Sequence, residues 1–341
     1  MNSKKILLDH GSGGAASREL IETVFLPGLA NPILSLFEDS AVLTVGSTRL
    51  AFTTDGYVVD PIFFPGGDIG KLAVHGTIND LAMQGADPIG LSLSLIIEEG
   101  FPMDDLERLA GSIAEASQFS NVPIVTGDTK VVPRGKADKI FITTSGVGVV
   151  PDRITLGSGS VQPGDAVLLS GFMGDHGVTI MSAQAGLSIE SSIVSDTAPL
   201  HAMVSALLKQ APEAIRCLRD PTRGGVATIL CEIADKSKVQ IEIDEKNLPV
   251  RPGVNTACEM LGLDPLYLAN EGKCIAIVDS DAAEELLSVM QKTIEGKDAQ
   301  IIGTVQAPES KTRHGRVILN TIIGGTRIVT PLSGEPLPRI C

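Results

Sequence analysis

The chain has 341 residues, of which 43% are hydrophobic and 20% are charged, and its formal net charge is -14. This length and composition predict two globular domains with sizeable cores. The acidic charge argues against a nucleic acid or an anionic membrane as the partner, because those surfaces select for clustered Lys and Arg.

The first part of the chain alternates strand-like and helix-like patterns. "RLAFTTD" (49–55) predicts a strand, residues 67–86 carry apolar side chains at helical spacing, and residues 89–97 alternate like a half-buried strand. An amphipathic helix is predicted at 103–119, and two further strands follow in "VPIVTGD" and "DKIFITTSGVGVV". This order is typical of a mixed α/β domain.

Glycine, serine and proline cluster at 151–165, where we predict a domain boundary. Beyond it the pattern restarts with the strand "AVLLSG". Helices are predicted near 175–187, 199–210, 224–236 and 281–294, and further strands at "VQIEI", "KCIAIV" and "AQIIGTV". The predicted organisation is an α+β or mixed α/β protein with three parts. They are an N-terminal domain (1–150, with a glycine-rich segment at 1–38), a C-terminal domain (151–310), and a final strand region with a mobile tail (311–341).

Other classes of protein are disfavoured by what the sequence lacks. No apolar run is long enough to cross a bilayer, and the apolar run near the N-terminus is too short for a signal peptide, so we expect a cytoplasmic protein. The five cysteines include no CxxC pair and predict neither a disulfide framework nor a zinc site.

Four carboxylates end predicted strands or lie in a helix of the first domain: Asp39, Asp55, Asp80 and Asp128. Oxygen ligands delivered from several elements are how proteins hold Mg²⁺, so we predict a metal and nucleotide set. Asp39 and Asp80 can equally be helix-start or solvated residues.

Two glycine-rich stretches supply backbone N–H groups that suit anions. "DHGSGG" contains Gly11, Gly13 and Gly14, and "DPTRGG" precedes a predicted helix. Neither a P-loop nor a GxGxxG motif is present, so a bound nucleotide would need another kind of site. Among the histidines, His176 is flanked by glycine and is site-like, whereas His75 is predicted to be packed.

The sequence ends in "PLSGEPLPRIC", which places a cysteine at position 341 behind three prolines. Together with "DHGSGG", "INDLAMQGA", "TGDTKVV", "SGFMGDHG", "RDPTRGGV" and "LANEGK", this ending resembles the HypE family of hydrogenase maturation factors. That family is similar in fold to aminoimidazole ribonucleotide synthetase, binds ATP without a P-loop and forms homodimers.

The resemblance implies a reaction. In such proteins the terminal cysteine, here Cys341, accepts a carboxamide from the carbamoyltransferase HypF, and ATP drives its dehydration to a thiocyanate. The cyano group then passes to iron on the HypC–HypD complex as a ligand for a [NiFe]-hydrogenase. The implied catalytic residues are Cys341, Lys130 of "GDTK", Glu271 of "NEG" and, less directly, His176. Asp39, Asp55, Asp80 and Asp128 are the implied Mg²⁺ set, joined at the nucleotide by Gly11, Gly13, Gly14 and Thr129.

The eleven residues from Pro331 to Cys341 reach at most about 35 Å when extended, and Pro336 and Pro338 favour an extended backbone. Such a tail can bring Cys341 to a nucleotide and also carry it to a partner. The alternatives are another ATP-using member of the same fold (aminoimidazole ribonucleotide synthetase, thiamine-phosphate kinase or selenophosphate synthetase) and a scaffold that presents Cys341 without catalysis.

Overall fold

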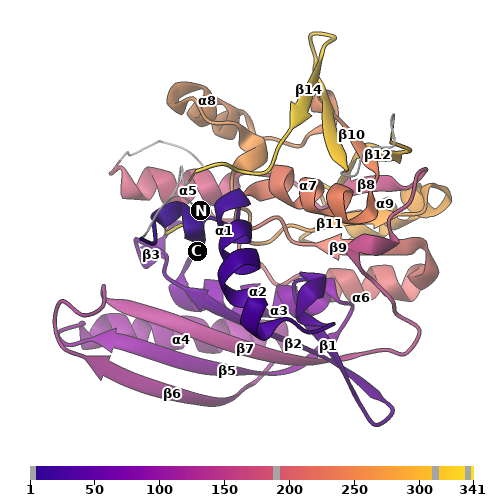
Figure 1. Cartoon of the computed structure of the whole chain (residues 1–341). Helices are drawn as coiled ribbons and strands as arrows, with labels where there is room; N and C mark the ends of the chain where they lie inside the picture. The colour runs from indigo at the N-terminus through magenta and orange to yellow at the C-terminus, as the bar shows by residue number, and fades with distance from the viewer. Residues whose placement is uncertain (1–4, 187–192, 309–314, 335–338) are drawn as a thin grey trace.

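The computed structural model describes residues 5–186, 193–308, 315–334 and 339–341. It confirms the predicted mixed α/β fold, with two main sheets (Figure 1). The five-stranded sheet has the order β1-β2-β7-β5-β6, and the seven-stranded sheet has the order β14-β13-β10-β12-β8-β11-β9. The first sheet ends with β7 at Val150 and the second begins with β8 at Ala166.

The N-terminal part begins with three short helical turns and then forms its sheet. Its helices are α1 (Ala15–Leu20), α2 (Leu26–Leu29), α3 (Ile69–Met83) and α4 (Met103–Ser120). Its strands are β1 (Ala41–Val45), β2 (Thr48–Tyr57), β3 (Phe63–Phe64), β4 (Gly67–Asp68), β5 (Asp87–Glu98), β6 (Ile124–Val132) and β7 (Ile140–Val150).

The C-terminal part supplies the second sheet and five further helices among the described residues. The helices are α5 (Asp175–Gln184), α6 (His201–Gln210), α7 (Gly225–Ser237), α8 (Pro252–Leu261) and α9 (Ala283–Gln291). The strands are β8 (Ala166–Leu169), β9 (Ile215–Arg219), β10 (Gln240–Asp244), β11 (Ile275–Val278), β12 (Gln300–Gln306), β13 (Arg316–Asn320) and β14 (Thr326–Val329).

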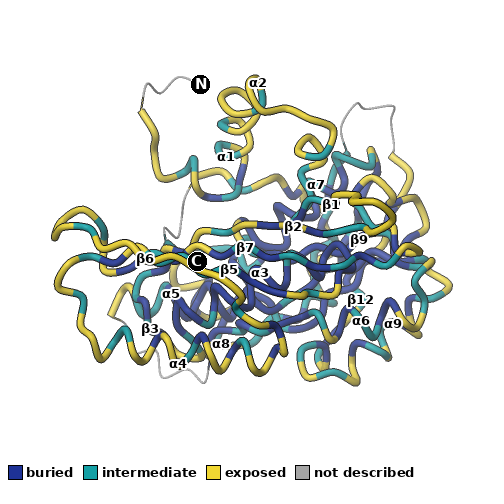
Figure 2. The backbone as a smooth tube through the Cα atoms, turned by 90° about the horizontal axis from the view of Figure 1, so that it is seen from below, coloured by how far each residue is buried: buried dark blue, intermediate teal, exposed yellow. Residues whose placement is uncertain are grey.

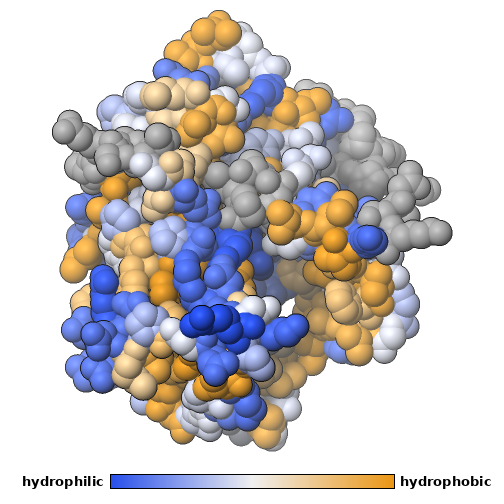
Figure 3. Space-filling view, turned by 90° about the vertical axis from the view of Figure 1, so that its left-hand side faces the viewer, coloured by the Kyte–Doolittle hydropathy of each residue, from blue (hydrophilic) through white to orange (hydrophobic). Residues whose placement is uncertain are grey.

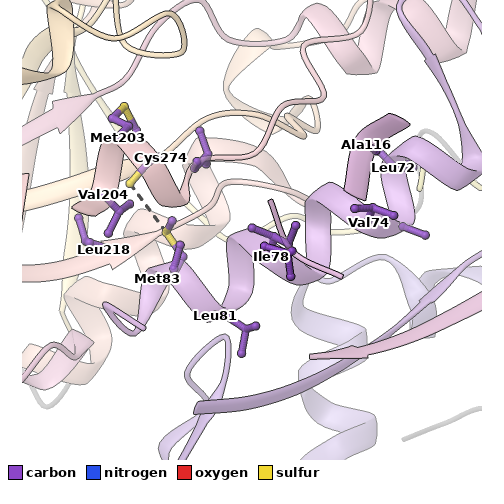
Figure 4. Close-up of a cluster of buried hydrophobic side chains, with 14 of the residues drawn as sticks. Leu72, Val74, Ile78, Leu81, Met83, Ala116, Met203, Val204, Leu218 and Cys274 are labelled. Atoms are coloured by element: carbon purple, nitrogen blue, oxygen red, sulfur yellow. Dashed lines mark hydrogen bonds between the residues drawn. The ribbon is translucent and has the colours of Figure 1, made fainter. Parts of the chain in front are cut away.

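Helix α3 is the centre of the molecule. It starts at Asp68, whose carboxylate accepts hydrogen bonds from the N–H groups of Gly70 and Lys71, as an N-cap does. Nearly all its residues are buried, because it packs on β2 and β7 on one side and on α6 and β9 on the other. Figure 4 shows Met83 at its end against Cys274 of the C-terminal part. The two parts therefore share one core.

The N-terminal sheet has two unlike faces. Helices α3 and α4 lie on one face, and inward residues such as Ala51 and Ile142 are buried there (Figure 1). On the other face Phe52 and Ile96 remain 42% and 39% exposed. The edge strand β6 is exposed along most of its length, as the yellow tube in Figure 2 shows. One face and one edge of this sheet therefore lack cover in a single chain.

Candidate active site

A group of buried carboxylates lies where β2, α3 and the loop after β9 meet. Asp55 extends from the inner face of β2 and accepts a 2.9 Å hydrogen bond from Thr77 Oγ1 on α3. One helical turn further on, Asp80 accepts a 2.7 Å bond from Thr53 Oγ1. Burial raises the pKa of both carboxyl groups, and the charge of Asp55 raises that of Asp80 further. We call Asp55, Asp80 and Asp220 the acidic cluster.

Asp220 follows β9 directly and is 6% exposed. Burial raises its pKa to about 6, and the nearby charge of Asp55 adds to this rise. Because all three carboxyls resist ionisation for the same reason, this is a place where added positive charge is strongly favoured.

Asp39 lies beside the cluster but is already paired. Its Oδ1 is 2.8 Å from Nε of Arg219, which is buried and also contacts Glu232 at 3.2 Å. Its Oδ2 is buried and, in the part of the chain that the structure describes, has no hydrogen-bond partner. Burial nevertheless raises the pKa of Asp39, so Arg219 offsets only part of the cost of desolvation.

A cavity of about 550 Å³ adjoins these residues between the N-terminal segment and α7. Gly11, Gly13, Arg219 and Arg223 are among its lining residues. Gly13 has φ +76°, and a Cβ there would lie 2.7 Å from Cβ of Arg223, so only glycine allows this close approach. The volume and the two arginines suit a phosphate-bearing nucleotide.

The end of the chain is docked beside this site. The N–H groups of Val58 and Asp60 donate to the carbonyls of Cys341 and Arg339, at 3.0 and 3.2 Å, as in a strand pair. Ile340 is 6% exposed and belongs to the main core. The negative charge of Cys341 is the largest cause of a raised pKa at Arg223, which places the guanidinium near the terminal cysteine. Pro336 and Pro338 lie outside the described residues.

Glu271 is buried on the other side of the cluster. Its N–H donates a 3.0 Å hydrogen bond to Asp196 Oδ1, while its own Oε1 is buried and has no hydrogen-bond partner among the described residues. Burial raises its pKa well above the usual range, and the charges of Asp196 and Asp220 add to this effect. In its ionised form Glu271 is therefore a stronger base than a solvated glutamate.

The predicted residues of β6 lie elsewhere. Asp128 pairs with Ser94 and Lys130 with Ile96 across the sheet, so both side chains point to the open face, opposite α3. They form a 2.7 Å ion pair with each other, and Lys130 lowers the pKa of Asp128. Thr129, between them, points to the other face, and its N–H donates to the Asp128 carboxylate. A single chain does not bring these residues to the acidic cluster.

Within the described ranges, no three His, Cys, Asp or Glu side chains are close enough to hold a metal ion by themselves. The buried carboxylates still fit a divalent cation, because Mg²⁺ commonly takes one or two carboxylates and completes its shell with phosphate and water. Their raised pKa values and the unpartnered oxygen of Asp39 are the features such an ion would satisfy.

Two site residues were missed from the sequence. Asp220 and Arg223 both lie in "DPTRGG", which we used only for its glycines. Their signal was available, because a carboxylate and a guanidinium directly after a strand and before the glycines that start α7 are typical of ligand-binding loops. Gly224 and Gly225, at φ +77° and +63°, allow the turn that puts both side chains into the site.

Comparison with known proteins gives a consistent result. The family model for the N-terminal domain of AIR synthase related proteins matches residues 37–150, and the model for their C-terminal domain matches residues 162–315. A carbamoyl dehydratase HypE from Azotobacter vinelandii is 53% identical over 332 residues, which is 97% of this chain and 96% of that protein.

Two solved structures show the same arrangement over most of the chain. A HypE–HypF complex has a TM-score of 0.86 at 47% identity and covers 92% of this chain and 99% of that one. A hydrogenase maturation protein HypE in complex with ATP has a TM-score of 0.83 at 48% identity, with 99% and 100% covered.

Proposed function

This chain belongs to the HypE family of carbamoyl dehydratases, and on that premise we propose that it dehydrates a carboxamide carried on the sulfur of its own Cys341. ATP drives the reaction and the product is a thiocyanate, the source of the cyanide ligand on the iron of a [NiFe]-hydrogenase. The resemblance inferred from the sequence motifs is thereby confirmed at the level of the family.

One observation carries the proposal: the C-terminal residues are held beside the acidic cluster. The main-chain bonds at Val58 and Asp60, the burial of Ile340 and the charge interaction between Cys341 and Arg223 all favour one docked position. A group attached to the sulfur of Cys341 would then lie near the arginine-lined cavity. Substrate and nucleotide are thus brought together by the chain itself, which lowers the entropic cost of their encounter.

The chemistry is a transfer of oxygen from carbon to phosphorus. The carboxamide oxygen attacks the γ-phosphorus of ATP and ADP leaves. The C–O bond then breaks as both N–H protons are lost, which gives S–C≡N, phosphate, ADP and one net proton in solution. Glu271 is our candidate for accepting an N–H proton, and Arg223 for stabilising charge on the transferred phosphoryl group.

We propose that one or two carboxylates of the acidic cluster (Asp55, Asp80 and Asp220) hold Mg²⁺ together with the ATP phosphates, with Asp39 beside them. The ion would supply positive charge to the phosphates and to the transferred phosphoryl oxygens. These side chains fit that task because they are buried close together and their raised pKa values reflect too little positive charge. Gly11, Gly13 and Gly14 form the loop that would close over the nucleotide.

We also propose that the protein acts as a homodimer through the open face of its N-terminal sheet. Phe52, Ile96 and the edge strand β6 are exposed in one chain, and an apolar face of this kind is typical of an interface. In this arrangement the side chains of Asp128 and Lys130, with the backbone of Thr129 between them, serve the nucleotide site of the second copy. Lys130 then polarises the phosphate there.

HypF is the proposed donor of the carboxamide, as the HypE–HypF structure suggests, and a HypC–HypD complex is the proposed acceptor of the cyano group. In the part of the chain that is described, no helix is both long and apolar enough to span a membrane. We place the reaction in the cytoplasm, where reduced cysteines such as the five of this chain are usual. Figure 3 shows a hollow beside hydrophilic side chains on one face, which suits access by a polar partner surface.

The intact mass of the protein tests the reaction. During incubation with HypF, carbamoyl phosphate and Mg²⁺–ATP, the mass of the protein should first rise by one carboxamide and then fall by the mass of one water. Cys341→Ser is the control and should show neither change. A carboxamide that forms and persists with fresh ATP would contradict the proposed dehydration.

A further inference from the structure

The last carbonyl before Cys341 is held by a buried histidine. Nε2 of His176 lies 2.7 Å from the carbonyl oxygen of Ile340, and Nδ1 lies 2.8 Å from Oγ of Ser195. Because a carbonyl oxygen only accepts hydrogen bonds, Nε2 must carry the proton and Nδ1 must accept one from the Ser195 hydroxyl. Ser195 Oγ in turn accepts a 3.2 Å bond from the N–H of Thr197. Every donor in this chain of bonds therefore points toward the tail.

The environment of His176 favours this single arrangement. The ring is fully buried, and the edge of Phe64 packs against it with ring centroids 5.7 Å apart. Burial lowers the pKa of His176, so the ring is neutral at neutral pH. Since both ring nitrogens are occupied, His176 has no atom left for proton transfer to the carboxamide. This differs from the catalytic role suggested by the sequence resemblance.

The segment that orients His176 also supports Glu271. Asp196, next to Ser195, accepts the N–H of Glu271 at 3.0 Å and lies 3.3 Å from Nζ of Lys273. A Cβ on Gly272 would lie 2.0 Å from the carbonyl oxygen of Asp196, so the two segments are in direct contact. Residues 195 and 196 thus fix the tail on one side and the proposed proton acceptor on the other.

We propose that Ser195 and His176 are positioning residues that hold the C-terminal tail in its docked state. Ser195 selects the imidazole tautomer, and the Nε2–H of His176 then binds the Ile340 carbonyl and places the Cys341 sulfur. The inference rests on the proposed function for its biological meaning. The docking itself does not depend on that function.

Alkylation of Cys341 by iodoacetamide, without nucleotide, measures docking directly. In His176→Phe and Ser195→Ala proteins, labelling of Cys341 should be about three- to tenfold faster than in the unmodified chain, as expected for the loss of one buried hydrogen bond. Subtracting the labelling of a Cys341→Ser protein assigns the signal to Cys341. Ser182→Ala is the matched control, because Ser182 lies on α5 with His176 and, among the described residues, bonds within that helix to the Val178 carbonyl.

His176→Gln separates positioning from bulk packing. The glutamine amide N–H can donate to the Ile340 carbonyl from nearly the same place, so labelling should return to within roughly twofold of the unmodified rate. If His176→Phe does not fold, Ser195→Ala alone decides. Labelling at the unmodified rate in folded Ser195→Ala and His176→Phe proteins would overturn the proposal.

A second readout concerns the reaction. In carboxamide-loaded protein, Ser195→Ala should slow the loss of water at saturating ATP by about three- to tenfold and leave the ATP concentration for half-maximal rate unchanged. If the variants are alkylated faster but the unmodified, carboxamide-loaded protein never loses water, the docking role is retained and the proposed function is rejected. Normal alkylation with normal water loss would reject the docking role alone.

Discussion

The carboxylates of the N-terminal sheet fall into two regions with opposite properties. Asp55 and Asp80 lie on its covered side, where burial raises the pKa of each. Asp128 lies on the open face of the edge strand, where the ion pair with Lys130 lowers its pKa. The buried aspartates therefore have too little positive charge nearby, whereas the exposed Asp128 is paired with a lysine.

This difference indicates that a single chain cannot bring Lys130 to its own acidic cluster. The acidic cluster needs cations, and the one lysine of the predicted set, Lys130, is on the far face of the same sheet, where it is paired with Asp128. A sheet cannot bring two of its faces together, so Lys130 reaches a cluster only if that cluster belongs to a second copy. The predictions below test this separation, beginning with the largest effect.

Asp80→Asn should reduce ATP-dependent loss of water from the loaded protein by at least about a hundredfold, as for removal of one electrostatic group at a reacting phosphate. Folding should survive, because the amide keeps the shape and costs less to bury. The rate is followed by intact mass. Asp152→Asn, at an exposed loop position, is the control and should react normally.

Mixing two inactive proteins tests the placement of Lys130. Lys130→Ala and Glu271→Gln proteins should each be slowed at least about tenfold, while both still accept the carboxamide. Co-refolded in equal amounts they should regain about a quarter of full activity, because half of the dimers are mixed and each mixed dimer has one intact site. If verified mixed dimers recover no activity, Lys130 and Glu271 of the same chain serve the same site, and the proposed placement is wrong.

Asp220→Asn should stabilise the fold and weaken the site. The folded pKa of Asp220, about 6, exceeds its unfolded value, so its contribution to stability is present below pH 4 and is lost as the pH rises through 6. Because asparagine cannot ionise, Asp220→Asn should raise the free energy of unfolding by at most ~3 kcal/mol at pH 7.5 and by little at pH 4. Urea unfolding without metal at both pH values measures this. If the variant is less stable than the unmodified protein at pH 7.5, burial does not destabilise the ionised Asp220 carboxylate as proposed.

Asp128→Asn should have the smallest effect on folding. Its side chain is 59% exposed and that of Lys130 is 67% exposed, and pairs of this kind contribute little to stability. The urea midpoint of dilute protein should not change measurably, although activity should fall. A clear drop in the midpoint would mean that Asp128 is part of the fold of its own chain.

Local patterns predicted much of the fold. Apolar spacing identified β2, α3 and α4, and the glycine-rich boundary separated the two sheets in the sequence. Helix α8 was missed although Pro252 begins it and Gly262 follows it, both standard signals. Strand β9 was missed because it ends in Arg219, a charged residue that is buried through its pairing with Asp39 and Glu232. Such an ion pair joins residues that are distant in the sequence, so a local hydrophobic pattern does not reveal it.

The site was predicted by residue type better than by position. Asp55 and Asp80 were identified, and the structure brings them together. That Asp128 faces away depends on the parallel register of β6 on β5, which no local pattern specifies. The role of Ser195 and His176 depends on the contact between His176 and Ile340, which are 164 positions apart, so it becomes visible only in three dimensions.

The close contact between distant parts of the chain also bears on how the protein is made. The N–H of Ala15 donates to the carbonyl of Leu332, and Val58 bonds to Cys341. A ribosome adds about 5 to 20 residues per second, so the early segments wait tens of seconds for their partners. The nascent N-terminal sheet can form in that time, but the catalytic pocket closes only after synthesis reaches the acceptor cysteine. An unfinished chain thus has an open pocket and lacks the Cys341 thiol that accepts the carboxamide.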